Sequence, residues 1–130
     1  MLKDKNILIG ITGGIAAYKI CELIRLFKKQ NCNVKVIATE NALNFVTKLT
    51  LETLSQNCVY TKQFDIENFA TEHISLSEWA DIFVIAPLSA NTLSKFANGI
   101  CDNLLTSVFC AFKKSVILCP AMNDGMWENI

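Results

Sequence analysis

Residues 6–14, NILIGITGG, decide the fold, because a continuous apolar run is closed there by Gly13 and Gly14. A run of this kind predicts a strand buried on both faces of a sheet. An amphipathic helix is expected directly afterwards, with its apolar side chains at helical spacing: Ile20, Leu23, Ile24 and Phe27. A strand, a tight turn and a helix in this order form the repeating unit of parallel sheets.

The same alternation continues along the chain. Residues 34–39, 82–86 and 115–119 are further apolar runs, and the last two are expected to stop at Pro87 and Pro120. Residues 58–61 suggest a short strand, and residues 62–78 are polar and have no assignment. Helical patterns cover 41–56 in two pieces, 89–98 ending at Gly99, and a segment after Asp102 or Asn103. The sequence predicts one α/β domain over 1–130, a Rossmann-like (flavodoxin-like), doubly wound parallel sheet in three α/β/α layers.

Composition restricts the possible partners. The chain has 130 residues, 52% of them apolar and 18% charged, against about 45–50% and 25% in ordinary soluble domains. Either a subunit interface or a tightly buried parallel sheet explains the apolar excess. The net charge is zero, and no basic run is longer than Lys28-Lys29 or Lys113-Lys114. Nucleic acid and anionic membrane surfaces are therefore not expected partners.

The six cysteines form no C-x-x-C pair, and the one histidine, His73, cannot build a His/Cys metal cluster. No metal site is expected, and the cysteines are predicted to be small buried residues in a reducing compartment. The N-terminal apolar run is too short to span a bilayer and has no cleavage-site pattern. These features together predict a cytoplasmic protein.

The turn after the first strand has the character of a phosphate site. Gly13 and Gly14 allow a sharp turn, and the N–H groups of Ile15 and Ala16 would face an anion at the start of the helix. The pattern is neither G-x-G-x-x-G nor a Walker loop, so a mononucleotide phosphate is favoured over a dinucleotide. A plain tight turn is the alternative.

Polar residues follow the other strands where doubly wound sheets bind ligands. Thr39 could add a bond to a phosphate, whereas Glu40 keeps a weaker dinucleotide alternative open because NAD-binding folds place an acid there. Ser89, Asn91 and Thr92 could bond the edge of a heteroaromatic ring, or could serve only to begin a helix.

Two further residues could act on a substrate, although each could instead have a purely structural role. His73 follows Glu72 in a polar stretch, which disfavours burial in a core, and an imidazole can serve as acid or base. Asn123 follows the last strand and could hold a carboxylate through its amide, although these residues taken alone favour a hydrophobic helix start.

These segments together resemble the homo-oligomeric flavin-containing cysteine decarboxylases. The similarity is greatest to the phosphopantothenoylcysteine decarboxylase part of the bifunctional coenzyme A enzyme. The matching stretches lie in order along the chain: GITGGIAAYKICELIR at 10–25, ATENALNFV at 38–46, HISLSEWAD at 73–81, APLSANTLSKFANGICDNLL at 86–105 and PAMNDGMW at 120–127.

The resemblance implies FMN as cofactor and a role for each matched residue. It implies that the phosphate loop of FMN is formed by Gly13, Gly14, Ile15 and Ala16, with help from Thr39. It implies that the flavin ring is contacted by Phe45, Ser89, Ala90, Asn91 and Thr92. His73 would be the catalytic base, and Asn123, with Met126 near it, would bind the substrate carboxylate and the flavin edge.

The implied activity is FMN-dependent oxidative decarboxylation of 4'-phosphopantothenoylcysteine to 4'-phosphopantetheine in coenzyme A biosynthesis. Oxidation to a thioaldehyde lets sulfur accept the charge that departing CO₂ leaves behind. Family members form trimers or multiples of trimers, so a homotrimer is expected. Two alternatives stay open: a peptidyl-cysteine decarboxylase of the lantibiotic type, and a flavin-binding subunit without catalysis.

One departure from the family pattern bears on turnover. Members continue beyond PAMN-x-x-M-W into a substrate clamp with a cysteine that protonates the late intermediate, whereas this sequence ends at Ile130. The sequence therefore predicts FMN binding and the early oxidative steps, and it leaves the final reduction in doubt.

Overall fold

The computed structural model describes residues 2–61 and 72–129. Its centre is a five-stranded, fully parallel sheet in the order β3-β2-β1-β4-β5. The strands are β1 (Asn6–Ile11), β2 (Asn33–Ala38), β3 (Val59–Tyr60), β4 (Ile82–Leu88) and β5 (Ser115–Pro120). This is the strand order of a doubly wound sheet of Rossmann type, so the expected fold is confirmed.

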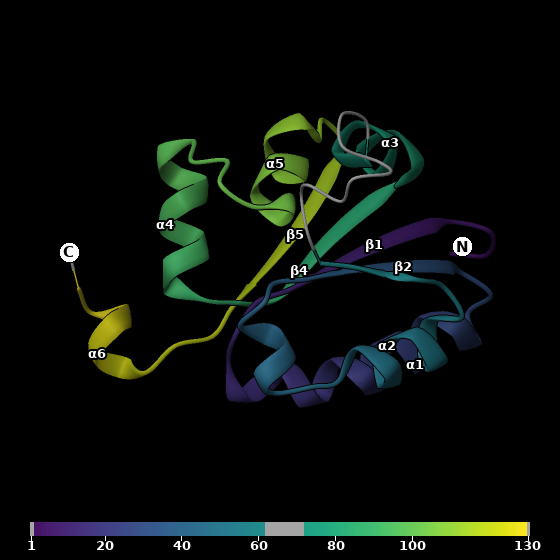
Figure 1. Ribbon diagram of the computed structural model, residues 1–130, viewed down its shortest axis with the longest axis horizontal. Coiled ribbons are helices and arrows are strands. Elements are labelled where there is room, and N and C mark those ends of the chain that lie inside the picture. The colour runs from purple at the N-terminus through teal and green to yellow at the C-terminus, as the bar shows by residue number, and fades with distance from the viewer. Residues whose placement is uncertain (1, 62–71, 130) are drawn as a thin grey trace.

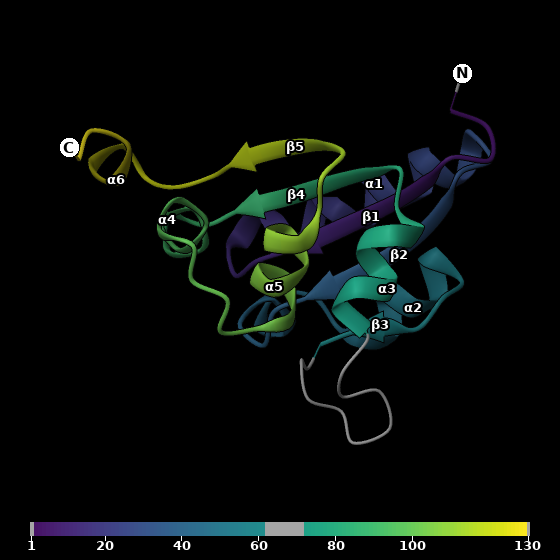
Figure 2. The same cartoon turned by 90° about the horizontal axis from the view of Figure 1, so that it is seen from above.

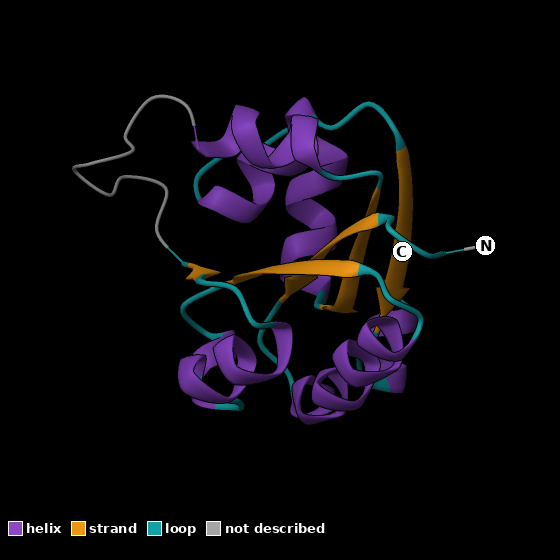
Figure 3. Cartoon of the chain, turned by 90° about the vertical axis from the view of Figure 1, so that its right-hand side faces the viewer, coloured by secondary structure: helices purple, strands orange, loops and turns teal. Residues whose placement is uncertain are grey.

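Helices cover both faces of the sheet, which gives the three expected layers (Figures 1 and 3). One layer contains η1 (Ile15–Lys19), α1 (Ile20–Lys29), η2 (Ala42–Asn44) and α2 (Lys48–Ser55). The other contains α3 (Glu72–Trp79), α4 (Ala90–Asn98) and α5 (Leu104–Ala111). The short α6 (Asp124–Trp127) lies beyond α4, at the end of the chain (Figure 2).

Two hydrophobic cores form because successive strand residues point to opposite faces. On β1, Ile7 and Ile9 enter the core under α1 and α2, whereas Leu8 enters the core under α3 and α5. On β4, Val84 and Phe83 divide in the same way. Burial on both faces explains why these strands are continuous apolar runs rather than alternating ones.

The helix ends follow local capping chemistry. Gly99 ends α4 at φ 68°, a left-handed conformation that glycine adopts without steric cost, as predicted. Asn103, rather than Asp102, begins α5. Its side chain accepts the Thr106 N–H at 2.9 Å, and the Thr106 hydroxyl accepts the Asn103 N–H at 3.1 Å, which together form a capping box.

Three expectations about element ends need correction. The strand expected to stop at Pro87 runs on to Leu88, with a cis Ala86–Pro87 peptide and a register shift against β5. Pro120 is likewise the last residue of β5 and does not lie beyond it. The first helix opens with five residues of 3₁₀ helix before α1. Of the unassigned stretch 62–78, residues 62–71 lie outside the described residues and the remainder belongs to α3.

The prediction that the cysteines are buried is wrong for four of the six. Cys32 is buried and Cys21 half-buried, whereas the other four are exposed: Cys58, Cys101, Cys110 and Cys119. Cys119 lies on β5, an edge strand that also exposes the large apolar side chains Ile117 and Leu118. Within the described residues, no helix is long and apolar enough to cross a membrane.

Candidate functional site

The carboxyl ends of β1 and β4 lie side by side where the strand order changes direction, the place where doubly wound sheets bind ligands. Thr12, 1% exposed, joins the two ends. Its hydroxyl donates to the carbonyl oxygen of Pro87 and accepts the N–H of Ser89 at 2.9 Å. The glycine turn after β1 and the loop after β4 are therefore fixed relative to each other.

Replacing Thr12 with valine is expected to lower the free energy of unfolding by about 1–3 kcal/mol, because the half-buried Ser89 N–H loses its acceptor and Pro87 loses one donor. Urea denaturation measures the change. Thr12→Ser keeps the hydroxyl and serves as the matched control, expected to lose clearly less. Equal losses in both variants would mean that removing the methyl group costs as much as removing the hydroxyl, which would contradict a dominant role of the two hydrogen bonds.

A cavity of about 570 Å³ opens at this edge of the sheet, and we call it the switch-point cavity. Its lining combines the turn after β1, the end of β2, the first turns of α4 and the start of α5. Five of the predicted cofactor residues line it: Gly13, Thr39, Ser89, Asn91 and Thr92. The volume lies within the range of about 300–1,000 Å³ usual for sites that bind small molecules and cofactors.

Gly13 is a position where this cavity tolerates no side chain. A Cβ atom there would lie 2.1 Å from Nδ2 and 2.9 Å from Cβ of Asn41, which also lines the cavity. The neighbouring Gly14 has room, since its nearest atom would be Pro87 Cγ at 4.0 Å. The first N–H groups of η1 follow this turn, and such groups have no acceptor within their own helix.

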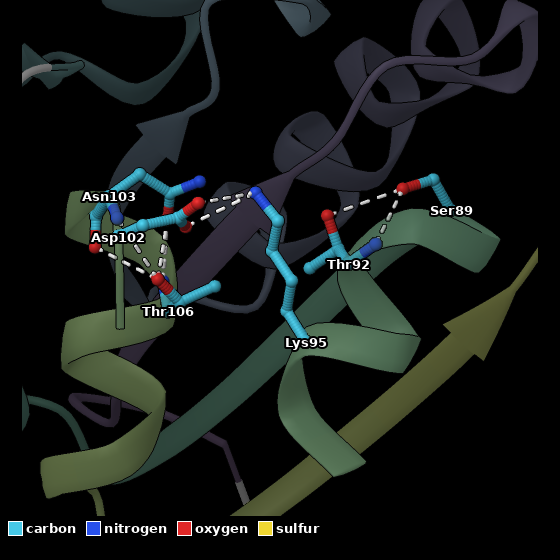
Figure 4. A network of polar contacts seen from close by, with 6 residues as sticks. All are labelled: Ser89, Thr92, Lys95, Asp102, Asn103 and Thr106. Carbon is cyan, nitrogen blue, oxygen red and sulfur yellow. Dashed lines mark hydrogen bonds and ion pairs between the residues drawn. The ribbon is translucent and has the colours of Figure 1, made fainter. Parts of the chain in front are cut away.

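The hydroxyl groups differ in what they can offer a ligand. Thr39 accepts the N–H of Ala42 at 3.2 Å, which leaves its own O–H free to donate. Ser89 caps α4 by accepting the Thr92 N–H at 3.2 Å, and its hydroxyl also donates to the Thr92 hydroxyl at 3.2 Å (Figure 4). These two side chains therefore serve mainly to fix the turn. The side-chain amide of Asn91 has no hydrogen-bond partner among the described residues, so it can reach a ligand.

Sequence reasoning missed part of the cavity lining: Asn41, Thr61, Lys95, Asp102, Asn103 and Leu105. Lys95 extends from α4 toward the start of α5, where its ammonium group lies 2.9 and 3.1 Å from the Asp102 carboxylate oxygens (Figure 4). The helical spacing of Lys95 to Asn91 and Thr92, four and three residues, was a signal that could have placed it on the same face. Asp102 and Asn103 follow a loop and gave no such signal.

Other predicted site residues do not line the switch-point cavity. They are Gly14, Ile15, Ala16, Phe45, Ala90, His73, Asn123 and Met126. His73 is half-buried near the start of α3. Asn123 is exposed and caps α6, since its side-chain oxygen accepts the Met126 N–H at 3.0 Å. This helix lies at the far end of the molecule from α3 (Figure 1), so one chain does not bring the predicted base and carboxylate-binding residue together.

The charged side chains of the cavity lining are Glu40 and the paired Lys95 and Asp102. Across residues 2–61 and 72–129, no cluster of three or more His, Cys, Asp or Glu side chains could hold a metal ion. Besides these charged groups, the lining offers hydrogen bonding from backbone, hydroxyl and amide groups around apolar side chains such as Leu105. Such a lining suits an organic ligand with an anionic end and an apolar ring.

The fold and this cavity define the chain as a Rossmann-type α/β protein with a cavity at its switch point. It belongs to the Flavoprotein family, whose model matches residues 1–130.

The chain is 42% identical over 130 residues to the coenzyme A biosynthesis bifunctional protein CoaBC of Bacillus subtilis, covering 99% of this chain and 32% of that protein. It therefore spans about a third of the length of that relative.

Two solved structures are similar along nearly the whole chain. A PPC decarboxylase mutant complexed with pantothenoylaminoethenethiol is 37% identical with a TM-score of 0.86, over 98% of this chain and 72% of the other. The FMN-dependent cysteine decarboxylase SpaF is 26% identical with a TM-score of 0.92, over 99% of this chain and 75% of the other.

Proposed function

We propose that residues 1–130 form an FMN-binding domain that catalyses decarboxylation of 4'-phosphopantothenoylcysteine to 4'-phosphopantetheine in coenzyme A biosynthesis. The observation that carries this proposal is the switch-point cavity, which joins the glycine turn, the Thr39 hydroxyl and the start of α4 at one site. The identity to CoaBC and to a PPC decarboxylase supports the substrate. A peptidyl-cysteine substrate is less favoured, since the identity to the peptidyl-cysteine decarboxylase EpiD is 32%, against 37% to the PPC decarboxylase.

The residues of the cavity fit FMN in chemistry and in size. Next to the cavity, the N–H groups at the start of η1 follow the Gly13 turn, and together with the free O–H of Thr39 in the lining they can bind a phosphate group. The Asn91 amide can bond the polar edge of a ring, while Ile37 and Leu105 supply apolar contact to its face. Bound FMN would take up and return the electron pair that makes loss of CO₂ from a cysteine carboxylate possible.

The other predicted residues would act on the substrate. In this proposal a ring nitrogen of His73 accepts a proton from the substrate. The Asn123 side-chain oxygen is fixed by its bond to Met126 N–H, which leaves the Nδ2 group free to donate to a carboxylate. Met126, 48% exposed, could cover one side of that carboxylate.

A homotrimer in the cytoplasm is part of the proposal. His73 and Asn123 lie away from the switch-point cavity, so a neighbouring copy could complete the site. Ile117 and Leu118 on β5 are 51% and 41% exposed and offer an apolar surface to such a neighbour. Sedimentation of the purified protein would test the assembly.

The first test is to purify the protein, record its visible absorbance and identify the released cofactor by mass. A yellow protein that releases FMN is the expected result. A colourless protein that also fails to take up added FMN would contradict the cofactor assignment.

Gly13→Ala is expected to weaken FMN binding by about tenfold or more, equivalent to about 1.4 kcal/mol, because the new methyl group displaces Asn41 from the cavity wall. Fluorescence titration of the protein with FMN measures the affinity. Gly125→Ala is the control, since its added Cβ would make only an ordinary contact at 3.5 Å. Unchanged affinity in Gly13→Ala would place the FMN phosphate elsewhere.

A further inference from the structure

Cys101 and Cys110 bring their thiol groups together at the surface, outside the proposed chemistry. Cys101 lies in the connection between α4 and α5, and Cys110 lies in the last turn of α5. Their sulfur atoms are 2.8 Å apart, and both residues are exposed. A disulfide holds its sulfur atoms at about 2.0 Å, so a further approach of about 0.8 Å would form the bond.

The surrounding structure holds the two thiols in this arrangement. Phe96 of α4 stacks on Phe109 of α5, with ring centroids 3.7 Å apart and planes 12° from parallel. At the start of the connection, the Ile100 N–H donates to the Lys95 carbonyl oxygen at 3.0 Å. At its end, the capping box of Asn103 fixes the first turn of α5. The connection is thus fixed on both sides of Cys101, which favours this pairing over any other.

The pair lies next to the switch-point cavity in the sequence and in space. Asp102 and Asn103 follow Cys101 directly, and both line the cavity. The Asp102 carboxylate also forms an ion pair with Lys95, another residue of the cavity lining. A covalent bond at Cys101 would therefore restrain the segment that carries these two residues.

We propose that Cys101 and Cys110 form a reversible disulfide that restrains residues 99–103 beside the switch-point cavity. The oxidant is a small-molecule disulfide. The Cys101 thiolate attacks one of its sulfur atoms, forms a mixed disulfide and releases one small thiol. The Cys110 sulfur then attacks the Cys101 sulfur, closes the protein disulfide and releases the second small thiol.

The neighbourhood of Cys110 affects the second step. Its hydrogen bond with Cys101, together with burial, raises the pKa of the Cys110 thiol. Cys110 must lose its proton before it attacks the mixed disulfide, so the raised pKa slows the closing step at low pH. A thiolate is the attacking species, so disulfide formation becomes faster as the pH rises.

Trypsin gives a direct test, because no lysine or arginine lies between Lys95 and Lys113 and one peptide, 96–113, carries both cysteines. Oxidised glutathione is expected to lower the mass of this peptide by two hydrogen atoms, and dithiothreitol to restore it. In Cys110→Ser the reaction should stop at a mixed disulfide, so the peptide gains one glutathione at Cys101. Cys119→Ser is the matched control and should behave as the unmodified sequence does.

Two results would overturn the proposal. One is a wild-type peptide that carries a glutathione on each cysteine, or that is linked to another cysteine. The other result concerns the restraint, which amide hydrogen exchange of residues 99–103 measures. Exchange is expected to slow on oxidation in the Cys119→Ser control and to stay unchanged in Cys110→Ser. Equal exchange rates before and after oxidation would show that the bond restrains nothing.

Discussion

Replacing His73 with asparagine is expected to lower the rate of the proposed decarboxylation by about 10²–10⁴-fold, the usual contribution of a positioned acid or base. Asparagine keeps a polar side chain of similar length but cannot accept a proton from the substrate. FMN binding is expected to persist, because His73 does not line the switch-point cavity. Carbon dioxide release, measured on FMN-loaded protein, gives the rate.

Ser75→Ala is the control on the same helix, since Ser75 is an exposed residue of α3. It should keep both activity and FMN. If His73→Asn also retained its activity within a few-fold, the assignment of the base would be wrong. If both FMN and activity were lost in that variant, His73 would instead have a structural role.

Phe83→Ala is expected to give the largest loss of stability, about 3–5 kcal/mol, through the removed apolar surface and the cavity left behind. Phe83 is fully buried on β4 and packs edge-on against Phe112, with centroids 5.5 Å apart. A Cβ on Gly10 would lie only 3.2 Å from its ring, so the packing there is tight. Against a typical total of about 5–15 kcal/mol, the variant would be marginally folded.

Urea denaturation of both proteins measures this loss. Leu49→Ala is the comparison, because Leu49 is 74% exposed and its truncation should change stability by no more than about 0.5 kcal/mol. A loss below about 1 kcal/mol for Phe83→Ala would mean that the core beneath α5 closes around the missing ring.

The succession of strands and helices along the chain was predictable because each element depends on local patterns. Buried parallel strands require unbroken apolar runs, and NILIGI at 6–11 is such a run whatever surrounds it. Gly99 was predictable as a helix end because few other residues adopt a positive φ easily. Pro87 misled the prediction, since a proline removes one N–H donor but still supplies the carbonyl oxygen that accepts from Thr12.

The sequence by itself determined the α/β class, the helix caps and the polar residues that follow each strand. Tertiary structure alone decided which of those residues share a site. Contacts such as Thr12 with Ser89, or Lys95 with the carboxylate of Asp102, depend on the strand order and on the path of a loop. Neither leaves a periodic signal in the sequence. The exposure of Cys101 and Cys110 was also a tertiary outcome, because burial depends on which face of a helix its neighbours cover and not on the hydrophobicity of the residue.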